Sequence, residues 1–123
     1  MIHDEIRAFL SNYFDVLQNQ DMALFDQVFH ADCVLYSTQD GKTVVRPYQA
    51  YREMVQGRAS PQSLNAPRMD KIMMIDVLSE EMALAKVDLR LFDNIMVDYL
   101  NINKVDGQWI LLAKHFSRKG SAI

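Results

Sequence analysis

Apolar residues return every three or four positions near the start of the chain, and this spacing is typical of amphipathic helices. A first helix is predicted between Ile2 and Leu17. Asp21 can cap a second, shorter helix, because its carboxylate accepts hydrogen bonds from free backbone N–H groups. Pro47 suits the first turn of a third helix, and Gly57 would end it. The apolar stripe of the first helix consists of Ile2, Ile6, Phe9, Leu10, Tyr13, Phe14 and Leu17.

Elsewhere the pattern changes to β-branched and aromatic runs separated by turn residues, which predict strands. A short hairpin is expected around Asp40-Gly41, and four longer strands follow a loop at residues 58–67. The connections between these four strands are short, at Ser79-Glu80, Asp93-Asn94 and Asp106-Gly107, so they should form an antiparallel meander. The fold class is therefore α+β. The predicted strands are residues 33–38, 43–45, 68–78, 82–92, 95–105 and 108–117.

The meander has two faces of different chemistry, and two-residue turns would fix which residues share a face. The apolar face carries Ala83, Ala85, Val87, Leu89, Leu91, Met96, Leu100, Ile102, Trp109, Leu111, Ala113 and His115, with Asp98 as its polar exception. On the polar face, one row of cross-strand neighbours reads Lys71, Asp88, Tyr99 and Lys114. Such a row is a candidate site only if it is shielded from water. The pattern by itself favours helices on the apolar face and solvent on the polar face.

Length and composition limit the classes of protein. A chain of 123 residues suffices for one core, so residues 1–123 are expected to form a single domain. The net charge is −3 with no basic stripe, so no nucleic acid is expected as a partner. No apolar stretch approaches a membrane span, and the N-terminus lacks the pattern of a signal peptide. Cys33 is the one cysteine and cannot form an internal disulfide, which fits a cytoplasmic protein.

Short motifs in a characteristic order carry a resemblance to a known superfamily. They are Tyr13-Phe14, Asp21, Phe29-His30-Ala31-Asp32, Asp98-Tyr99-Leu100, Asp106-Gly107-Gln108-Trp109-Ile110 and Lys114-His115-Phe116. In this order the chain resembles the nuclear transport factor 2-like (SnoaL-like) superfamily over nearly its whole length. Within it, the chain is most similar to the small bacterial proteins of the "putative lumazine-binding" family. The resemblance implies a cone, in which a curved mixed sheet of about six strands wraps around three helices of the N-terminal half.

The resemblance assigns the two faces differently from the pattern. In the superfamily's isomerases and epoxide hydrolases the pocket residues have the parity of the polar face, so that face would line the cone. The apolar face would lie outside, and because a monomer rarely exposes so large an apolar face, we expect a homodimer through it. The expected pocket walls are Phe14, Tyr51, Met54, Leu112 and Phe116, and the expected polar contacts are Asp88, Arg90, Tyr99, Asn101 and Lys114.

The chain departs from the catalytic patterns of both enzyme groups. By resemblance, the general base of the steroid isomerases falls at Ser37, their tyrosine at Phe14 and their second acid near Asn101. The acid–arginine–acid set of the epoxide hydrolases becomes Asp88 between two lysines. Neither activity is therefore expected.

The expected function is the binding of a small organic ligand in a partly polar cavity. One alternative is a cofactor-free isomerase or dehydratase acting on a small carbonyl compound, in which Lys114 or Asp88 moves the proton and Tyr99 polarises the oxygen. Another is a dimerisation module with a vestigial cavity. No cofactor is expected, and no metal site, because the three histidines are dispersed along the chain. His115 is expected to pair with Asp98 on the apolar face.

Overall fold

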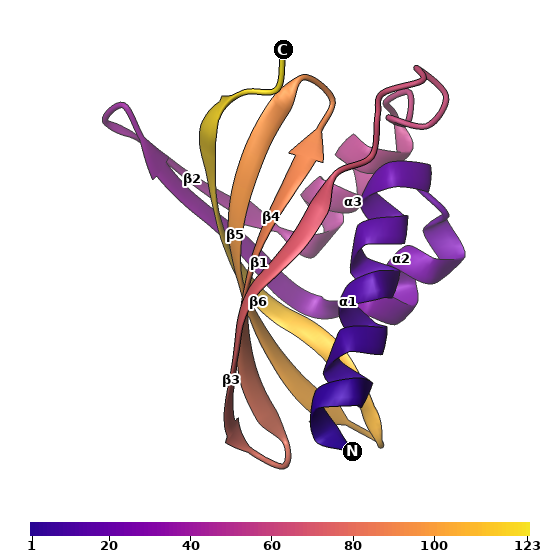
Figure 1. Cartoon of the computed structure of the whole chain (residues 1–123), viewed down its shortest axis with the longest axis vertical. Coiled ribbons are helices and arrows are strands. Elements are labelled where there is room, and N and C mark those ends of the chain that lie inside the picture. The colour runs from indigo at the N-terminus through magenta and orange to yellow at the C-terminus, as the bar shows by residue number, and fades with distance from the viewer.

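Three helices cover one side of a curved six-stranded sheet in the computed structural model, which describes residues 1–123 (Figure 1). The helices are α1 (Ile2–Asn19), α2 (Met22–Val28) and α3 (Tyr48–Gln56). The strands are β1 (Phe29–Gln39), β2 (Lys42–Pro47), β3 (Asp70–Ser79), β4 (Met82–Leu91), β5 (Asn94–Val105) and β6 (Gln108–Ser121). The predicted α+β class, with three helices in the N-terminal half and a six-stranded curved sheet, is confirmed.

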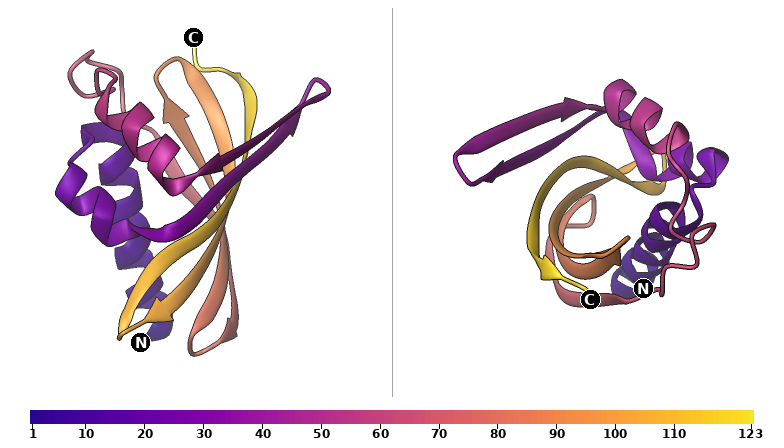
Figure 2. Two further views of the ribbon diagram at one scale, coloured as in Figure 1. Left: turned by 180° about the vertical axis from the view of Figure 1, so that it is seen from behind. Right: turned by 90° about the horizontal axis from the view of Figure 1, so that it is seen from above.

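The sheet is mixed, with the strand order β2-β1-β6-β5-β4-β3. Strands β1 and β6 run parallel, and all other neighbours are antiparallel. The C-terminal strand therefore joins the N-terminal hairpin to the predicted meander. Seen from above, strands β3 to β6 curl toward α1 while the β1–β2 hairpin projects away from the curl (Figure 2).

The local signals that predicted the helices lie at their ends. Asp21 caps α2, where its Oδ1 accepts hydrogen bonds from the backbone N–H groups of Ala23 and Leu24 at 3.0 and 3.2 Å. Gly57 directly follows the last residue of α3. Pro47 lies just before that helix instead of inside its first turn, where its fixed backbone angle still suits the entry to a helix.

The apolar face of the meander packs beneath the helices and forms the core. Leu100 and Leu111 are fully buried, whereas Tyr99, beside Leu100 in the same strand, is 40% exposed. The orientation implied by the resemblance, with this face outside, is therefore wrong for β4, β5 and the first half of β6. Burying the more apolar face against the stripe of α1 removes more apolar area from water, so this packing has the lower free energy. The buried residues of this face are Ala83, Ala85, Val87, Leu89, Leu100, Ile102, Trp109 and Leu111.

A β-bulge at Leu112 exchanges the two faces halfway along β6. Ile102 pairs with Leu111, but the preceding residue, Asn101, pairs with Ala113, so Leu112 has no partner on β5. One extra residue in a strand turns every later side chain to the opposite face. Lys114 consequently lies opposite Leu100 and points into the core side of the sheet.

The hairpin between β4 and β5 turns one residue earlier than expected. Leu91 pairs with Asn94, so the turn residues are Phe92 and Asp93, and Phe92 takes a left-handed backbone with φ 56°. The register moves by two residues, which keeps the faces but changes the neighbours, and Tyr99 now lies opposite Lys86.

The predicted row across the polar face is consequently broken. Asp88 lies on the outer surface of the sheet opposite Lys71, as predicted, but its ion-pair partner is Lys119, with Oδ2 and Nζ 3.5 Å apart. Lys114 lies on the other side of the sheet, so the expected proximity of Asp88 and Lys114 is wrong.

Candidate functional site

Two charged side chains are buried side by side on the inner face of the sheet. Lys114 is 4% exposed and Asp98 is 1% exposed, and no other charged residue is buried. The Lys114 Nζ lies 3.5 Å from Asp98 Oδ2. The bulge at Leu112 places Lys114 there, and Asp98 is the one acidic residue of the apolar face. Since burial without a partner would be costly for either charge, each stabilises the other.

Tyr13 of α1 completes this group from the helix side. Its hydroxyl donates a hydrogen bond to Asp98 Oδ2 over 2.5 Å, and the side chain is fully buried. Burial and the neighbouring carboxylate of Asp98 both raise the pKa of Tyr13 well above its ordinary value. The phenol therefore stays neutral and acts as a donor. The expected pairing of Asp98 with His115 is wrong, because the bulge turns His115 to the exposed face.

Aromatic rings surround the Lys114 ammonium. The Nζ atom lies 5.2 Å from the ring centre of Tyr13, 5.6 Å from that of Tyr51 and 5.9 Å from that of Phe116. Ring faces attract cations at such distances, and the attraction is stronger where water is excluded. The position is therefore built to hold a positive charge that Asp98 balances.

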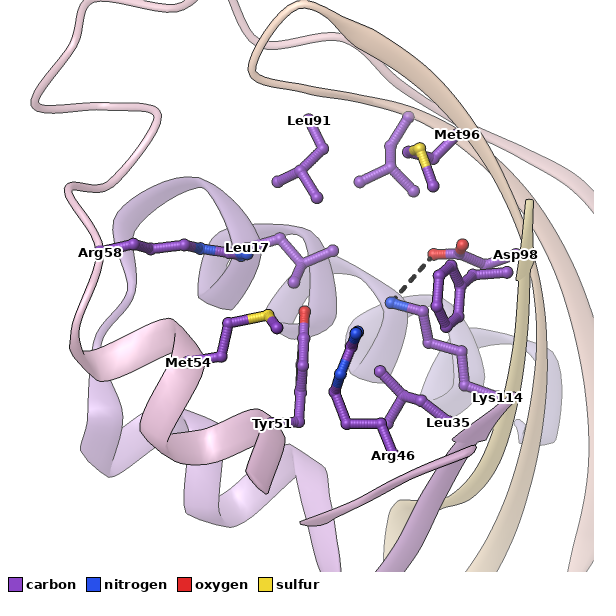
Figure 3. Close-up of a pocket in the computed structure, with 12 residues that line it drawn as sticks. Leu17, Leu35, Arg46, Tyr51, Met54, Arg58, Leu91, Met96, Asp98 and Lys114 are labelled. Carbon is purple, nitrogen blue, oxygen red and sulfur yellow. Dashed lines mark ion pairs between the residues drawn. The ribbon is translucent and has the colours of Figure 1, made fainter. Parts of the chain in front are cut away.

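A cavity of about 90 Å³ opens beside the Lys114–Asp98 pair (Figure 3). Helix α1 contributes to its wall, as do α3, the loop that follows α3, and the sheet. Most of the lining is apolar, and Met54, which is 41% exposed, connects it to the surface. The lining residues are Leu17, Leu35, Arg46, Tyr51, Met54, Arg58, Leu89, Leu91, Met96, Asp98, Lys114 and Phe116.

The cavity wall contains polar atoms that have no partner within the chain. Asp98 Oδ1 and Arg58 Nη2 are both buried and unpaired, and the third atom of this kind is the Trp109 Nε1. Buried polar atoms are nearly always hydrogen-bonded in proteins, so two exceptions on one cavity are unusual. Arg46 also lines the cavity, and its side chain makes no hydrogen bond or ion pair, although its guanidinium lies 5.9 Å from the Phe116 ring.

The structure distributes the predicted site residues over three places. Tyr51, Met54, Lys114 and Phe116 line the cavity. Asp88, Tyr99 and Asn101 lie on the outer face of the sheet, and Leu112 is the half-buried bulge residue. The remaining two, Phe14 and Arg90, line a separate void of about 10 Å³.

Arg90 is engaged near the turn between β4 and β5. Its Nε donates to the Phe92 carbonyl at 2.7 Å, and its Nη2 lies 3.1 Å from an Asp93 carboxylate oxygen. A guanidinium that is already paired in this way has little left to offer a ligand.

Sequence reasoning missed four polar residues of the site. Tyr13 was assigned to the apolar stripe, and Arg46 and Arg58 lie at a strand end and in a loop, where periodicity carries no information. Asp98 gave a usable signal, because one carboxylate on an otherwise apolar face must find a buried cation or donor.

No group of three histidine, cysteine, aspartate or glutamate side chains is arranged to hold a metal ion. No helix is both long enough and apolar enough to cross a membrane.

Comparison with known proteins relates this geometry to others. A family model described as "Putative lumazine-binding" matches residues 2–117. Among curated proteins, none matches the chain.

Solved structures share the fold over almost the entire chain. An NTF2-like protein of unknown function from Shewanella baltica OS155 superposes with a TM-score of 0.83 at 21% identity, covering 97% of this chain and 94% of that one. A ketosteroid isomerase-like protein from Erwinia carotovora atroseptica SCRI1043 superposes with a TM-score of 0.73 at 12% identity, covering 95% of each chain. A cystatin-like fold protein from Burkholderia xenovorans LB400 superposes with a TM-score of 0.70 at 14% identity, covering 95% of this chain and 91% of that one. At these identities the likeness shows the fold alone.

Proposed function

Because the chain belongs to the "Putative lumazine-binding" family, as the resemblance predicted, we propose that it binds a small organic molecule in the cavity beside Lys114 and Asp98. The observation that carries the proposal is the pair of unpartnered polar atoms, Asp98 Oδ1 and Arg58 Nη2, on one mostly apolar wall. A buried polar atom without a partner costs about 1–3 kcal/mol. A ligand with a donor and an acceptor group would recover that cost, and few polar groups on an apolar wall are typical of ligand sites.

The volume limits the size of the ligand. A cavity of about 90 Å³ is smaller than the roughly 150 Å³ cavity that admits benzene in an engineered protein. It is also below the roughly 300–1,000 Å³ of most drug-sized sites. A flat bicyclic compound, such as the one in the family's description, would enter only if Met54 and Arg46 shifted. Neither side chain is fully buried, so both have room to move.

Methionine methyl groups offer a site-specific test of binding. Of the eight methionines, Met54 and Met96 line the cavity, whereas Met1 and Met73 are exposed outside it. We would titrate protein labelled with ¹³C in its methionine methyl groups with a panel of small neutral, anionic and cationic organic compounds. Binding in the cavity shifts the signals of Met54 and Met96 and leaves those of Met1 and Met73 in place. Shifts that spare Met54 and Met96 for every compound would refute the proposal.

A cofactor-free isomerase or dehydratase is the second candidate. The observation that favours it is the position of Lys114, whose ammonium lines the cavity and could donate a proton to a carbonyl oxygen. Asp88 and Tyr99, the other groups expected to take part, lie on the outer face. The test is deuterium exchange at the α-carbon of small ketones and aldehydes in D₂O, compared between the wild type and Lys114→Met. Exchange no faster than in buffer would remove this candidate.

The outer face of the sheet is proposed to pair with a second copy of the chain. The apolar face of the meander lies under the helices and is not available for this contact. Large side chains still gather on the outer face, where Tyr36, Met82 and Tyr99 are 38, 40 and 40% exposed. Light scattering after gel filtration should give a molar mass of twice the 14.2 kDa of one chain, and the Tyr99→Lys variant should have a lower molar mass than the wild type. A wild-type monomer at micromolar concentration would contradict the dimer.

A further inference from the structure

We propose that the ligand of this cavity is an organic anion, held by the guanidinium groups of Arg46 and Arg58. The inference rests on the proposed function and adds to it the charge class of the ligand. Three cationic side chains and one carboxylate line the cavity, so its wall carries two net positive charges in a chain whose net charge is −3.

The two arginines are the cations whose charge is unbalanced. Lys114 is matched by Asp98 at 3.5 Å. Arg58 donates through Nε to the neutral amide oxygen of Gln20 at 3.0 Å, while its buried Nη2 has no partner. No carboxylate lies within ion-pairing distance of Arg58 or Arg46. The chain has seven arginines, and four of them pair with an aspartate: Arg7, Arg52, Arg68 and Arg90.

The geometry suits a planar acid. Figure 3 shows the Arg46 side chain rising between Tyr51 and Lys114, while Arg58 extends toward Leu17 from the opposite side of the cavity. Guanidinium groups present a flat array of N–H donors that matches a carboxylate, and two such bonds to one acid are strong and directional. The rings of Tyr51 and Phe116 offer flat apolar surfaces for the body of the ligand.

Asp98 adds a requirement of the opposite sign. Its Oδ1 is a buried acceptor that repels an anion and attracts an N–H or O–H group. The acid group is therefore expected beside the two arginines, and any donor group of the ligand beside Asp98 on β5.

Pairs of compounds that differ only in charge test the inference. Acetate against acetamide and benzoate against benzamide have nearly equal size and shape within each pair. We would titrate each compound into the ¹³C-methionine protein and follow the signals of Met54 and Met96, with the affinity confirmed by calorimetry. The carboxylate of at least one pair should bind about tenfold more tightly than its amide, an ordinary difference for a charge-assisted pair.

Two variants assign that preference to the arginines. Arg46→Gln and Arg58→Gln should each remove most of the tenfold preference without weakening the amide. Arg7→Gln is the matched control, because it removes the same charge from an exposed site on α1 and should change nothing. Arg58→Gln loses the bond to Gln20, so Arg46→Gln decides the outcome if the Arg58 variant does not fold. Replacing Arg46 breaks no hydrogen bond.

The outcomes separate this inference from the function on which it rests. If the amides shift Met54 and Met96 as strongly as the acids do, or if both Gln variants keep the preference, the anion assignment is overturned and ligand binding stands. If no acid or amide shifts either methionine but another compound of the panel does, the anion assignment alone is overturned; if no compound of the panel shifts them, both are overturned.

Discussion

The buried pair of Lys114 and Asp98 makes a strong prediction about stability. Asp98→Asn keeps the size of the side chain and an oxygen that can accept from Tyr13, but it removes the only carboxylate near the Lys114 ammonium. At 3.5 Å and an effective dielectric constant of about 20, the Coulomb attraction is about 5 kcal/mol. Removing one partner of a buried pair costs roughly 3–5 kcal/mol, because the other charge stays in the interior without compensation.

Urea unfolding followed by circular dichroism measures this cost, with Lys114→Met and the double variant completing a thermodynamic cycle. Each single variant should lower the free energy of unfolding by about 3–5 kcal/mol, out of roughly 5–15 kcal/mol for a domain. For a chain of 123 residues this lowers Tm by about 10–20 °C. The double variant should lose at least about 2 kcal/mol less than the sum, since neither charge is then left alone. The exposed pair of Arg7 with Asp4 is the control, and Asp4→Asn should cost less than about 1 kcal/mol.

A different result would refute the reasoning. If Asp98→Asn and Lys114→Met each cost less than about 1 kcal/mol and the double variant equals their sum, the two charges are solvated and independent. The bulge would then not bury Lys114, and the cavity would lose its polar wall.

Tyr13, Cys33 and the bulge residue Leu112 each give a further prediction. The pKa of Tyr13 is raised in the folded chain, so as the pH rises the unfolded chain loses the phenol proton first. The contribution of Tyr13 to stability is therefore complete below about pH 10 and is lost as the pH rises further. Above that pH, the free energy of unfolding should fall more steeply for the wild type than for Tyr13→Phe. Parallel slopes in urea unfolding at pH 9 to 11 would contradict this. Burial raises the pKa of the Cys33 thiol to about 12, so a thiol reagent at pH 8 should react with the urea-unfolded chain and hardly at all with the native one; rapid native labelling would disprove it. Deleting Leu112 should return Lys114 to the outer face and cost at least about 4 kcal/mol, whereas Leu112→Ala keeps the bulge and should cost about 1–2 kcal/mol in the same unfolding assay. A deletion variant as stable as the wild type would show that the bulge is dispensable.

The elements and the buried face of the sheet were predictable because both follow from periodicity. The stripe on α1 and the alternation along β4 and β5 are strong patterns, and burial of apolar area decides between the two faces. The pattern was the better guide here, and the orientation implied by the resemblance was wrong for most of the meander.

The bulge in β6 was not predictable, for a physical reason. Residues 109–113 read Trp-Ile-Leu-Leu-Ala, a run without alternation, so either face of the strand can be buried at little cost. Tertiary contacts then decide, and the inward position of Lys114 against Asp98 requires the extra residue.

The turn between β4 and β5 was also missed, because an aromatic residue is unfavourable in a left-handed backbone. Phe92 is held there by one local and one long-range contact: its carbonyl accepts a hydrogen bond from the Arg90 Nε, and its ring lies 5.2 Å from the Arg58 guanidinium. The contact with Arg58 joins segments far apart in the sequence, and it also helps to place Arg58 on the cavity wall.

Crystals soaked with small organic acids and with their amides test most directly whether the cavity binds an organic anion. Electron density shows the position of a bound molecule itself, whereas a shifted signal reports it only indirectly. The account predicts density for an acid inside the cavity, with its carboxylate toward Arg46 and Arg58 and its body between Tyr51 and Phe116. Compounds found only in exposed clefts or on the outer face of the sheet, with the cavity side chains in their original places, would contradict it.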